Sequence, residues 1–309
     1  MQARIRAIRL EAEGIASYRL EPLPGHHFPA FTAGAHIEVA LERGLTRSYS
    51  LVNDPADFDV YELGVQLDPS SRGGSLFIHE RWHVGQVVDI SEPRNHFPLN
   101  ESAAHTILIG GGIGITPLLS MAARLQALGR SWELHYAVRT RNSLPFAERL
   151  TAMAPVHLTV DDEPQTPRLD LQRLLEGVPD SAHVYCCGPE RMLDAYRVHG
   201  QRLGDRLHFE YFVASTEVAI EGGYSVRLHR SGQEIPVKAG ETMLDALLNA
   251  GVNVPFACSE GICGTCRVGV LDGLPDHRDN FLSAEEKSCN GSILVCCSGS
   301  RSPVLTLDL

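Results

Sequence analysis

The sequence predicts a three-domain protein of the mixed α/β and β classes. We expect an N-terminal antiparallel β-barrel, a central doubly wound parallel α/β sheet and a small C-terminal domain with a cysteine-rich loop. The length of 309 residues supports several domains, because a domain usually has about 100–200 residues. The pattern changes near residue 104 from strands alone to alternating strands and helices, and six of the eight cysteines follow residue 257. The expected domains are 1–102, 103–214 and 224–309, with a linker at 215–223.

Six short runs in the first hundred residues alternate partly between apolar and polar side chains, which is typical of strands. They are Ile5–Leu10, Ala16–Glu21, His36–Leu41, Arg47–Val52, Tyr61–Leu67 and Gln86–Ile90. Turn-forming sequences such as Pro22-Leu23-Pro24-Gly25 separate them. Short strands at this spacing predict a small antiparallel barrel or sandwich.

Strands and helices alternate in the second domain. Thr106–Ile109 is a buried-strand pattern, and the helix Pro117–Leu128 follows a glycine-rich turn and stops at Gly129. The other expected strands are Trp132–Val138, Val156–Val160, His183–Cys187 and Leu207–Phe212, and the other helices are Phe146–Met153, Leu169–Leu175 and Glu190–His199. This alternation predicts a parallel sheet with helices on both faces.

The third domain begins with a hairpin. Tyr224–His229 and Glu234–Val237 are strand patterns joined by Ser231-Gly232. A helix starts after Thr242, with Asp245 three residues on as in a capping box, and Gly251 ends it.

Composition excludes several classes of protein. With 43% hydrophobic residues the chain can build cores, and 27 basic against 38 acidic residues give a net charge of −11, which disfavours nucleic-acid binding. No apolar run approaches the ~20 residues of a membrane span, and no apolar stretch follows Met1–Arg6 as in a signal peptide. We expect a cytoplasmic monomer without membrane contact. None of the 14 histidines forms a sequence spacing typical of metal ligands.

The cysteine-rich loop has a metal-cluster spacing. Cys258, Cys263 and Cys266 form C-x4-C-x2-C, and Cys296 follows after a further 29 residues, which is the plant-type [2Fe–2S] arrangement. Small residues with positive φ suit a loop wrapped around a cluster, and Gly261 and Gly264 are placed for it. A zinc site and unrelated buried thiols are the alternatives, but zinc sites usually repeat a short paired spacing.

The third domain thus resembles a plant-type ferredoxin domain of β-grasp fold. The resemblance implies that Cys258, Cys263, Cys266 and Cys296 bind the cluster. Cys297 is the rival for the fourth position, and alternation along a strand would point it away from the cluster. Cys289 is expected to be a spare thiol.

Two segments of the first domain carry groups suited to a phosphorylated planar ligand. Arg47-Ser48-Tyr49-Ser50 offers an arginine, an aromatic ring and a hydroxyl, which we expect to share one face of a strand. Arg72-Gly73-Gly74-Ser75 precedes a helical stretch, where backbone N–H groups can bind an anion. An ordinary exposed strand and a plain loop are the alternatives.

Together these two segments resemble the flavin-binding signature of the ferredoxin–NADP reductase superfamily. With the ferredoxin-like domain at the C-terminus, almost the whole chain resembles the phthalate dioxygenase reductase family, whose members bind FMN. The resemblance makes domain 1–102 the FMN-binding barrel and 103–214 the NAD-binding domain. It implies that Arg47 and Ser75 hold the phosphate, Tyr49 packs on the flavin and Ser50 lies near its N5. The expected FMN set is Arg47, Ser48, Tyr49, Ser50, Gln66, Gly73, Gly74, Ser75, Thr116 and Phe212.

The nucleotide motifs follow strands of the second domain. Gly110-Gly111-Gly112-Ile113-Gly114-Ile115-Thr116-Pro117 opens a helix, which suits a pyrophosphate, and Tyr185-Cys186-Cys187-Gly188-Pro189 ends a later strand, where ligands of parallel sheets bind. Both resemble motifs of the superfamily, as does His208–Phe212, whose final aromatic would stack near the flavin. A tight turn, a buried thiol and a core strand are the respective alternatives. The expected NAD set is Gly111, Gly112, Gly114, Pro117, Arg139, Arg141, Cys187, Gly188 and Pro189, and the expected catalytic residues are Ser50, Thr116 and Cys187.

The nucleotide preference rests on Arg139 and Arg141, which follow a strand and are placed for the adenosine half. Two arginines can recognise the 2′-phosphate of NADPH, whereas the family resembled uses NADH, and we favour NADH.

These parts predict electron transfer. The resemblance implies a reductase that passes electrons from NADH through FMN and [2Fe–2S] to a partner protein, the terminal oxygenase of a Rieske-type non-haem iron system in aromatic catabolism or demethylation. The first alternative is a stand-alone NADH:acceptor reductase serving another carrier or a cytochrome P450. The second is an iron–sulfur sensor or carrier without flavin, which the flavin and glycine motifs disfavour.

Overall fold

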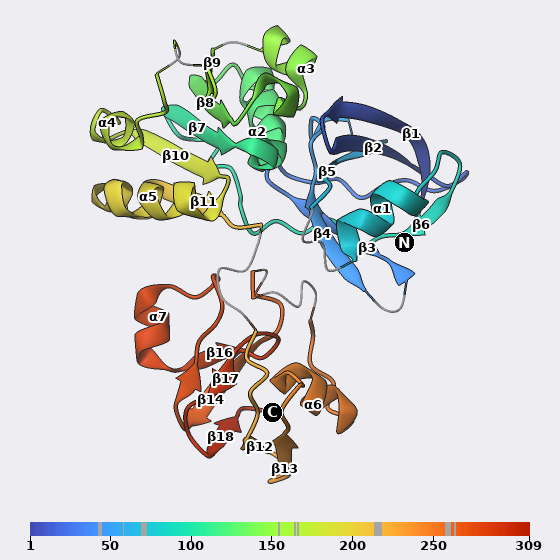
Figure 1. The fold of residues 1–309 in the computed structure, drawn as a ribbon, viewed down its shortest axis with the longest axis vertical. Coiled ribbons are helices and arrows are strands. Elements are labelled where there is room, and N and C mark those ends of the chain that lie inside the picture. The colour runs from blue at the N-terminus through green and yellow to red at the C-terminus, as the bar shows by residue number, and fades with distance from the viewer. Residues whose placement is uncertain are drawn as a thin grey trace. The chain divides into compact units, whose positions relative to one another are not determined.

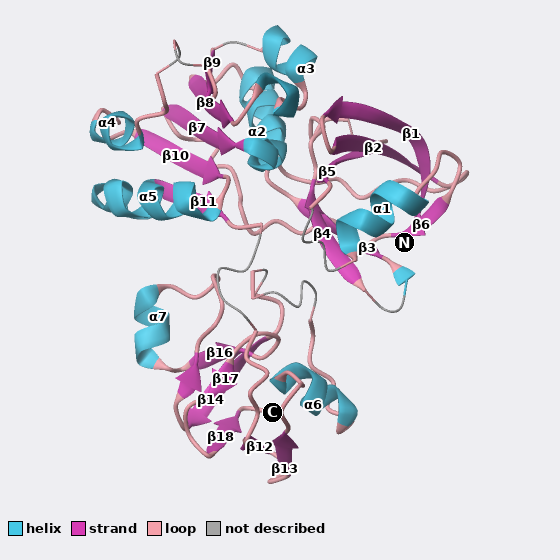
Figure 2. Ribbon diagram, viewed as in Figure 1, coloured by secondary structure: helices cyan, strands magenta, loops and turns pink. Residues whose placement is uncertain are grey.

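The computed structural model describes the chain except residues 43, 44, 58, 69–72, 154, 164, 166, 213–217, 257–260 and 263, and the side chain of residue 284. The chain divides into two compact units, Met1–Glu210 and Tyr211–Leu309. Figures 1 and 2 show the elements of each unit. No helix among the described residues is long and apolar enough to cross a membrane.

The first unit begins with a closed antiparallel barrel. Its strands are β1 (Gln2–Ala12), β2 (Ile15–Pro22), β3 (His36–Ala40), β4 (Thr46–Ser50), β5 (Tyr61–Gln66) and β6 (Val87–Asp89). Four of them form a sheet in the order β5-β2-β1-β6, and β3 pairs with β4. Bridges Val39↔Ile90 and Leu51↔Leu63 join the two sheets. The strands therefore close in the order β1-β2-β5-β4-β3-β6, and closure leaves no unpaired edge.

The barrel interior is filled by inward-facing side chains from its strands. Ile5, Leu20, Ile37, Leu51, Leu63 and Val88 belong to one buried cluster. Helix α1 (Gly74–Arg81) adds Ile78 to this cluster. The period-2 alternation of the sequence thus becomes an apolar interior and a polar exterior.

The rest of the first unit is a five-stranded parallel sheet in the order β11-β10-β7-β8-β9. Its strands are β7 (His105–Gly111), β8 (Trp132–Val138), β9 (Val156–Val160), β10 (Ala182–Cys187) and β11 (Leu207–Glu210), and its helices are α2 (Ile115–Ala127), α3 (Ala147–Ala152), α4 (Leu171–Glu176) and α5 (Glu190–Gly200). The chain runs outward from β7 in one direction and from β10 in the other. The doubly wound sheet is confirmed, and β7 and β10 mark its topological switch point, where ligands of such sheets bind.

One strand of this sheet is shorter than expected. The sequence pattern continues to Phe212, but β11 ends at Glu210, the last residue of the first unit. Register explains the end, because Cys187 of β10 pairs with Glu210 and β10 stops there.

The second unit has a five-stranded sheet in the order β13-β12-β18-β14-β16 and a short pair, β15-β17. Its elements are β12 (Tyr224–Leu228), β13 (Glu234–Val237), α6 (Met243–Asn249), β14 (Arg267–Asp272), β15 (Pro275–Asp276), α7 (Ala284–Cys289), β16 (Ser292–Leu294), β17 (Gly299–Ser300) and β18 (Val304–Leu307). The capping box of Thr242 and Asp245 is present, and Gly251 after α6 has φ +80°. This arrangement is the β-grasp fold that the sequence predicts.

The segment expected to be a linker is partly built into the second unit. Residues 215–217 lie outside the described residues. Ala219 is buried and its N–H donates to the Cys297 carbonyl, and the Ile220 carbonyl accepts from Gly240. Gly222 has φ +64° and lies against the Lys238 backbone. The proposed domain boundaries remain predictions.

Candidate functional site

The carboxyl ends of β7 and β10 meet at the switch point through glycines. A Cβ built on Gly114 would lie 2.6 Å from the Gly188 nitrogen and nearer still to the Cys187 carbonyl oxygen. A Cβ on Gly111 would lie 2.7 Å from the Pro189 ring. No side chain therefore fits between the two loops. Gly112 and Ile113, which precede α2, are half-buried, and backbone N–H groups there could bind a nucleotide, which is the role predicted for the glycine motif.

Cys187 lies at the end of β10, beside this crevice. Its side chain is fully buried, and burial, with a smaller effect of the neighbouring Glu210, raises the pKa of its thiol well above the ordinary value. The sulfur is therefore a neutral thiol and not a nucleophile. Cys186, equally buried, faces the opposite side of the strand and contributes to the core, as expected.

Glu210 is a functional candidate that the sequence analysis did not single out. It pairs with Cys187 across β11 and β10. Part of the residue reaches the surface, but its Oε2 is buried and has no hydrogen-bond partner within the described residues. Burial raises the pKa of Glu210 to about 8, against the opposing effect of a hydrogen bond with Ser50. The carboxyl group is therefore largely protonated at neutral pH.

Ser50 brings the barrel into the same site. It is the last residue of β4, is 6% exposed and hydrogen-bonds Glu210. Successive side chains of a strand point to opposite faces, so Arg47 and Tyr49 share one face and Ser50 belongs to the other. The expectation that all three share a face is wrong. Because Ser50 points to the other face, it contacts Glu210 of the nucleotide-binding sheet.

Thr116 packs between the two parts of the first unit. It lies in the first turn of α2, is 2% exposed, and its Oγ1 donates to the Ile113 carbonyl at 3.0 Å. A Cβ on Gly64 of β5 would lie 2.7 Å from Thr116 Cγ2. The hydroxyl is thus held by the turn that precedes α2, and the methyl group packs against the barrel.

Arg47 and the amino end of α1 form an anion cradle. A Cβ on Gly74 would lie 2.7 Å from Arg47 Nε, so only a glycine lets the guanidinium pack over the helix end. Gly73 caps α1 with φ 94° and offers no side chain to the first N–H groups. Ser75 Oγ, in this turn, accepts from the Asp68 N–H at 3.1 Å. An arginine beside uncapped N–H groups fits a phosphate.

The remaining residues of the expected flavin set are less closely gathered. Tyr49 is half-buried and packs against the barrel core, whereas Ser48 and Gln66 are exposed. Phe212 belongs to the second unit. Arg72 lies outside the described residues.

The two arginines of the adenosine half differ in their surroundings. Arg139 is exposed at the end of β8. Arg141 forms a two-pronged ion pair with Glu163, with Nη2 donating to Oε2 at 3.0 Å and Nε to Oε1. Glu163 follows β9, so the pair joins the ends of two neighbouring strands. A 2′-phosphate would compete with Glu163 for this guanidinium.

Two of the four expected cluster ligands lie in the described part of the second unit. Cys266 and Cys296 are each 2% exposed and belong to its core. They meet because β14 starts directly after Cys266 and β16 ends at Leu294, its partner being Arg267. Cys258 and Cys263 lie outside the described residues. Gly261 and Gly264 have φ of +70° and +73°, as the loop requires.

Cys297, the other candidate for the fourth cluster ligand, lies in a turn and not in a strand. β16 stops at Leu294, so strand alternation, our reason for pointing Cys297 away, does not apply. Residues 295–297 form a turn in which the fully buried Cys297 Sγ lies 3.8 Å from the Leu294 carbonyl oxygen. A Cβ on Gly261 would lie 2.5 Å from this sulfur. The thiol therefore packs under the loop.

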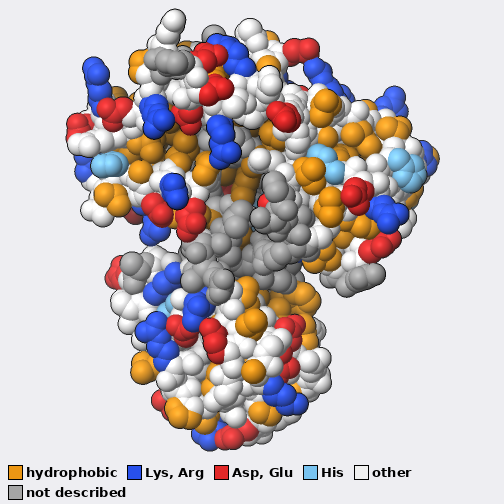
Figure 3. Space-filling model, in the orientation of Figure 1, with side chains coloured by type: hydrophobic (Ala, Val, Ile, Leu, Met, Phe, Trp, Pro, Cys, Tyr) orange, Lys and Arg blue, Asp and Glu red, His pale blue; other side chains and the backbone are white. Residues whose placement is uncertain are grey.

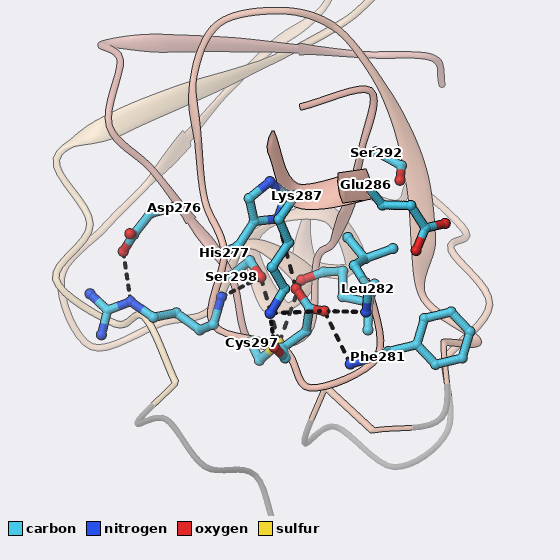
Figure 4. Close-up of polar contacts among 12 residues, drawn as sticks. Asp276, His277, Phe281, Leu282, Glu286, Lys287, Ser292, Cys297 and Ser298 are labelled. Atoms are coloured by element: carbon cyan, nitrogen blue, oxygen red, sulfur yellow. Dashed lines mark hydrogen bonds and ion pairs between the residues drawn. The ribbon is translucent and has the colours of Figure 1, made fainter. Parts of the chain in front are cut away.

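A buried carboxylate lies in the turn next to this loop, and Figure 4 shows Phe281, Leu282 and Lys287, which surround it. Asp279 is 1% exposed and accepts the N–H groups of Phe281 and Leu282 at 3.2 and 2.7 Å. The Lys287 ammonium donates to its backbone carbonyl. Asn280 donates its N–H to the Gly261 carbonyl at 3.0 Å, which ties this turn to the cysteine loop.

A cavity of about 460 Å³ lies away from the switch point, between the barrel and α3. Its charged groups pair with one another, as Arg9 does with Glu148 at 2.8 Å and Arg149 with Glu62 at 2.6 Å. The cavity lies within the first unit, and none of the residues that line it is a predicted site residue.

The fold and the site define an electron-transfer oxidoreductase with a nucleotide-binding sheet and an iron–sulfur domain. Residues 108–198 match the family described as oxidoreductase NAD-binding domain, and residues 226–300 match the 2Fe-2S iron-sulfur cluster binding domain.

Relatives extend the match to the whole chain. The phenoxybenzoate dioxygenase subunit beta of Ectopseudomonas oleovorans is 46% identical, over 99% of this chain and 96% of its own. The phthalate dioxygenase reductase of Burkholderia cepacia is 38% identical, with 96% and 94% covered. A solved phthalate dioxygenase reductase superposes with a TM-score of 0.80 at 37% identity, with 100% of this chain and 98% of that one covered. The chain belongs to the phthalate dioxygenase reductase family.

A further solved structure, an intact type IV self-sufficient cytochrome P450 monooxygenase, matches with a TM-score of 0.84 at 37% identity. All of this chain is covered, but only 41% of that one.

Proposed function

We propose that the protein is an NADH-dependent reductase that passes electrons through FMN and a [2Fe–2S] cluster to the terminal component of an oxygenase system. The observation that carries this proposal is the convergence of Ser50, Cys187 and Glu210 at the switch point beside the glycine loops. One group comes from the barrel and two from the nucleotide-binding sheet.

A bound flavin accepts two electrons as a hydride and releases them singly, which couples a nicotinamide to a one-electron cluster. The chain supplies position and electrostatics. The anion cradle of Arg47 and α1 would hold the flavin phosphate, and the loops at Gly111 and Gly114 would hold the pyrophosphate of NADH. The protonated carboxyl of Glu210 and the neutral thiol of Cys187 add no negative charge where a hydride passes.

Cys258, Cys263, Cys266 and Cys296 would bind the cluster. Support comes from Cys266 and Cys296, which share one end of the β14–β16 pair, and from the positive φ of Gly261 and Gly264.

NADH is the preferred nucleotide in this proposal, because Glu163 already neutralises Arg141. A 2′-phosphate would have to displace that carboxylate.

The partner is a protein oxygenase. Phenoxybenzoate dioxygenase and vanillate O-demethylase are the systems named for relatives at 46% and 43% identity. Acidic and basic side chains are interspersed on the face drawn in Figure 3, so charge segregation does not mark the docking site there. We place the protein in the cytoplasm, because NADH is available there, and we propose that it is a monomer.

The test is an absorption spectrum of the purified holoprotein, release and identification of the flavin, and titration with NADH and with NADPH. We expect FMN, a [2Fe–2S] spectrum and bleaching by NADH. A holoprotein without flavin bands would refute the proposal.

A second acceptor is favoured by a specific observation. The support for it is the match of this chain to 41% of a self-sufficient cytochrome P450 monooxygenase. Supplying the reductase with a Rieske-type oxygenase or with a P450 separates the two. We expect product formation coupled to NADH consumption with the Rieske-type oxygenase and not with the P450.

A further inference from the structure

Four titratable side chains gather on β7, β8 and β9, within the strands and not in the loops of the redox site. His105 is the first residue of β7, Glu133 and His135 are in β8, and His157 is in β9. His135 and His157 are directly paired across the parallel strands. Glu133 and His135 are two residues apart and therefore share a face. The sheet thus presents these groups on one rigid surface.

Distances show that the groups converge through long contacts with the Glu133 carboxylate. Glu133 Oε1 lies 3.5 Å from His135 Nε2, and Glu133 Oε2 lies 3.6 Å from His157 Nε2. Hydrogen bonds from nitrogen to oxygen are shorter, at about 2.7–3.2 Å. His135 Nε2 is buried and has no hydrogen-bond partner within the described residues. A buried nitrogen without a partner is costly unless something else binds it.

The distances between these nitrogen and oxygen atoms are close to those of a shared metal ion. The rings of His135 and His157 stack at 4.6 Å with 19° between their planes, so the exposed His157 ring would have to turn to direct its nitrogen at such an ion. Zinc binds nitrogen and oxygen at about 2.0–2.1 Å in tetrahedral geometry, which separates neighbouring ligand atoms by roughly 3.3 Å. One donor atom from each of Glu133, His135 and His157 lies within 4.8 Å of the others. We propose that these three residues bind a divalent transition-metal ion of the Zn²⁺ class. Imidazole favours such an ion over Mg²⁺ or Ca²⁺.

The fourth position has two candidate ligands, water and His105. His105 Nε2 lies 3.8 Å from Glu133 Oε1, and its Nδ1 is 2.8 Å from Ser131 Oγ. A partner on the second ring nitrogen commonly orients metal-binding histidines.

This site was missed by sequence analysis because its ligands come from neighbouring strands. His135 and His157 are separated along the chain by a whole helix and its loops, so no short spacing marks them. The ion would tie β8 to β9 and stabilise the folded sheet, because it binds only the native arrangement.

The experiment is isothermal titration of the holoprotein, with its cluster in place, with Zn²⁺. We expect one site in the wild type and at least a tenfold weaker affinity in His157→Ala. His157 is 55% exposed, so its replacement leaves the fold intact. His199→Ala, an exposed histidine of α5 in the same domain, is the matched control and should bind as the wild type does. The visible absorption of the cluster should remain constant.

Three results would overturn the proposal. One is no heat of binding in the wild type, and another is equal affinity in the wild type and His157→Ala. The third is loss of cluster absorption in step with binding, which would place the zinc on the thiolates. A rise in the midpoint of thermal unfolding with Zn²⁺ in the wild type, absent in His157→Ala, is the second expected readout.

Discussion

Replacing Gly114 by alanine tests whether the switch point is the nicotinamide site. The added Cβ would lie 2.6 Å from Gly188 N and nearer to the Cys187 carbonyl. Ordinary contact begins near 3.4 Å, so the two loops must separate by roughly 1 Å. Both clashing groups are backbone, and overpacking of this kind costs about 1–3 kcal/mol. The φ of −62° at Gly114 is allowed for alanine, so the steric contact is the only cause.

The expected functional loss is larger than the loss of stability. A misplacement of about 1 Å at a reacting centre can lower the rate about 100-fold. We therefore expect kcat/KM for NADH, measured with ferricyanide as acceptor, to fall about 100-fold while flavin content stays near that of the wild type. Gly177→Ala is the control, because its Cβ would meet only the carbonyls of Arg173 and Leu174 at 3.6 Å. A Gly114→Ala protein with kcat/KM within twofold of the wild type would refute the assignment.

Three further substitutions address the other groups of the site. Glu210→Gln removes a carboxyl whose pKa is raised to about 8 by burial. Since the native state keeps this proton while the unfolded state loses it, stability of the wild type should fall as pH rises from about 5 to 8, by up to ~1.4 kcal/mol per pH unit. In thermal scans, the Glu210→Gln protein should lack this fall in stability with pH. Identical pH profiles for the wild type and Glu210→Gln would contradict the raised pKa of Glu210. Arg47→Ala should weaken FMN binding by about 10–100-fold, the effect of one charged hydrogen bond, in a fluorescence titration; unchanged affinity would remove the arginine from the cradle. Cys296→Ser should abolish the cluster, as measured by iron content. Cys297→Ser and the exposed Cys289→Ser should retain it. Loss of the cluster in Cys297→Ser and its retention in Cys296→Ser would make Cys297 the fourth ligand.

Local sequence patterns predicted elements well wherever a turn residue marks the end. The bounds of β8, β9 and β13 agree with the expected ranges, and the capping box at Thr242 forms as the sequence indicates. In these segments the spacing of apolar residues and the flanking turn residues predict the same element. Tertiary contacts therefore do not change its bounds.

Features that depend on long-range pairing were not predictable in this way. Closure of the barrel rests on bridges between residues far apart, such as Val39 and Ile90. Glu210 looks like an ordinary strand carboxylate until its oxygen is buried beside Cys187 and Ser50. The alternation argument for Cys297 failed because β16 ends two residues before the cysteine pair. In each case tertiary contacts, and not the residue's own neighbours, decide its environment.

The two proposed sites use different residues of one sheet, so a substitution can be chosen that affects one site and not the other. Gly111 and Cys187 end β7 and β10, whereas His105 and His157 lie at the start of β7 and β9. His135 is the proposed ligand nearest the redox site, because it is level with Ile109, two residues or roughly 7 Å along the strand from Gly111. None of the proposed ligands belongs to the loops that follow β7 and β10. Zinc should therefore change unfolding without changing NADH oxidation, and Gly114→Ala should lower NADH oxidation without changing zinc affinity.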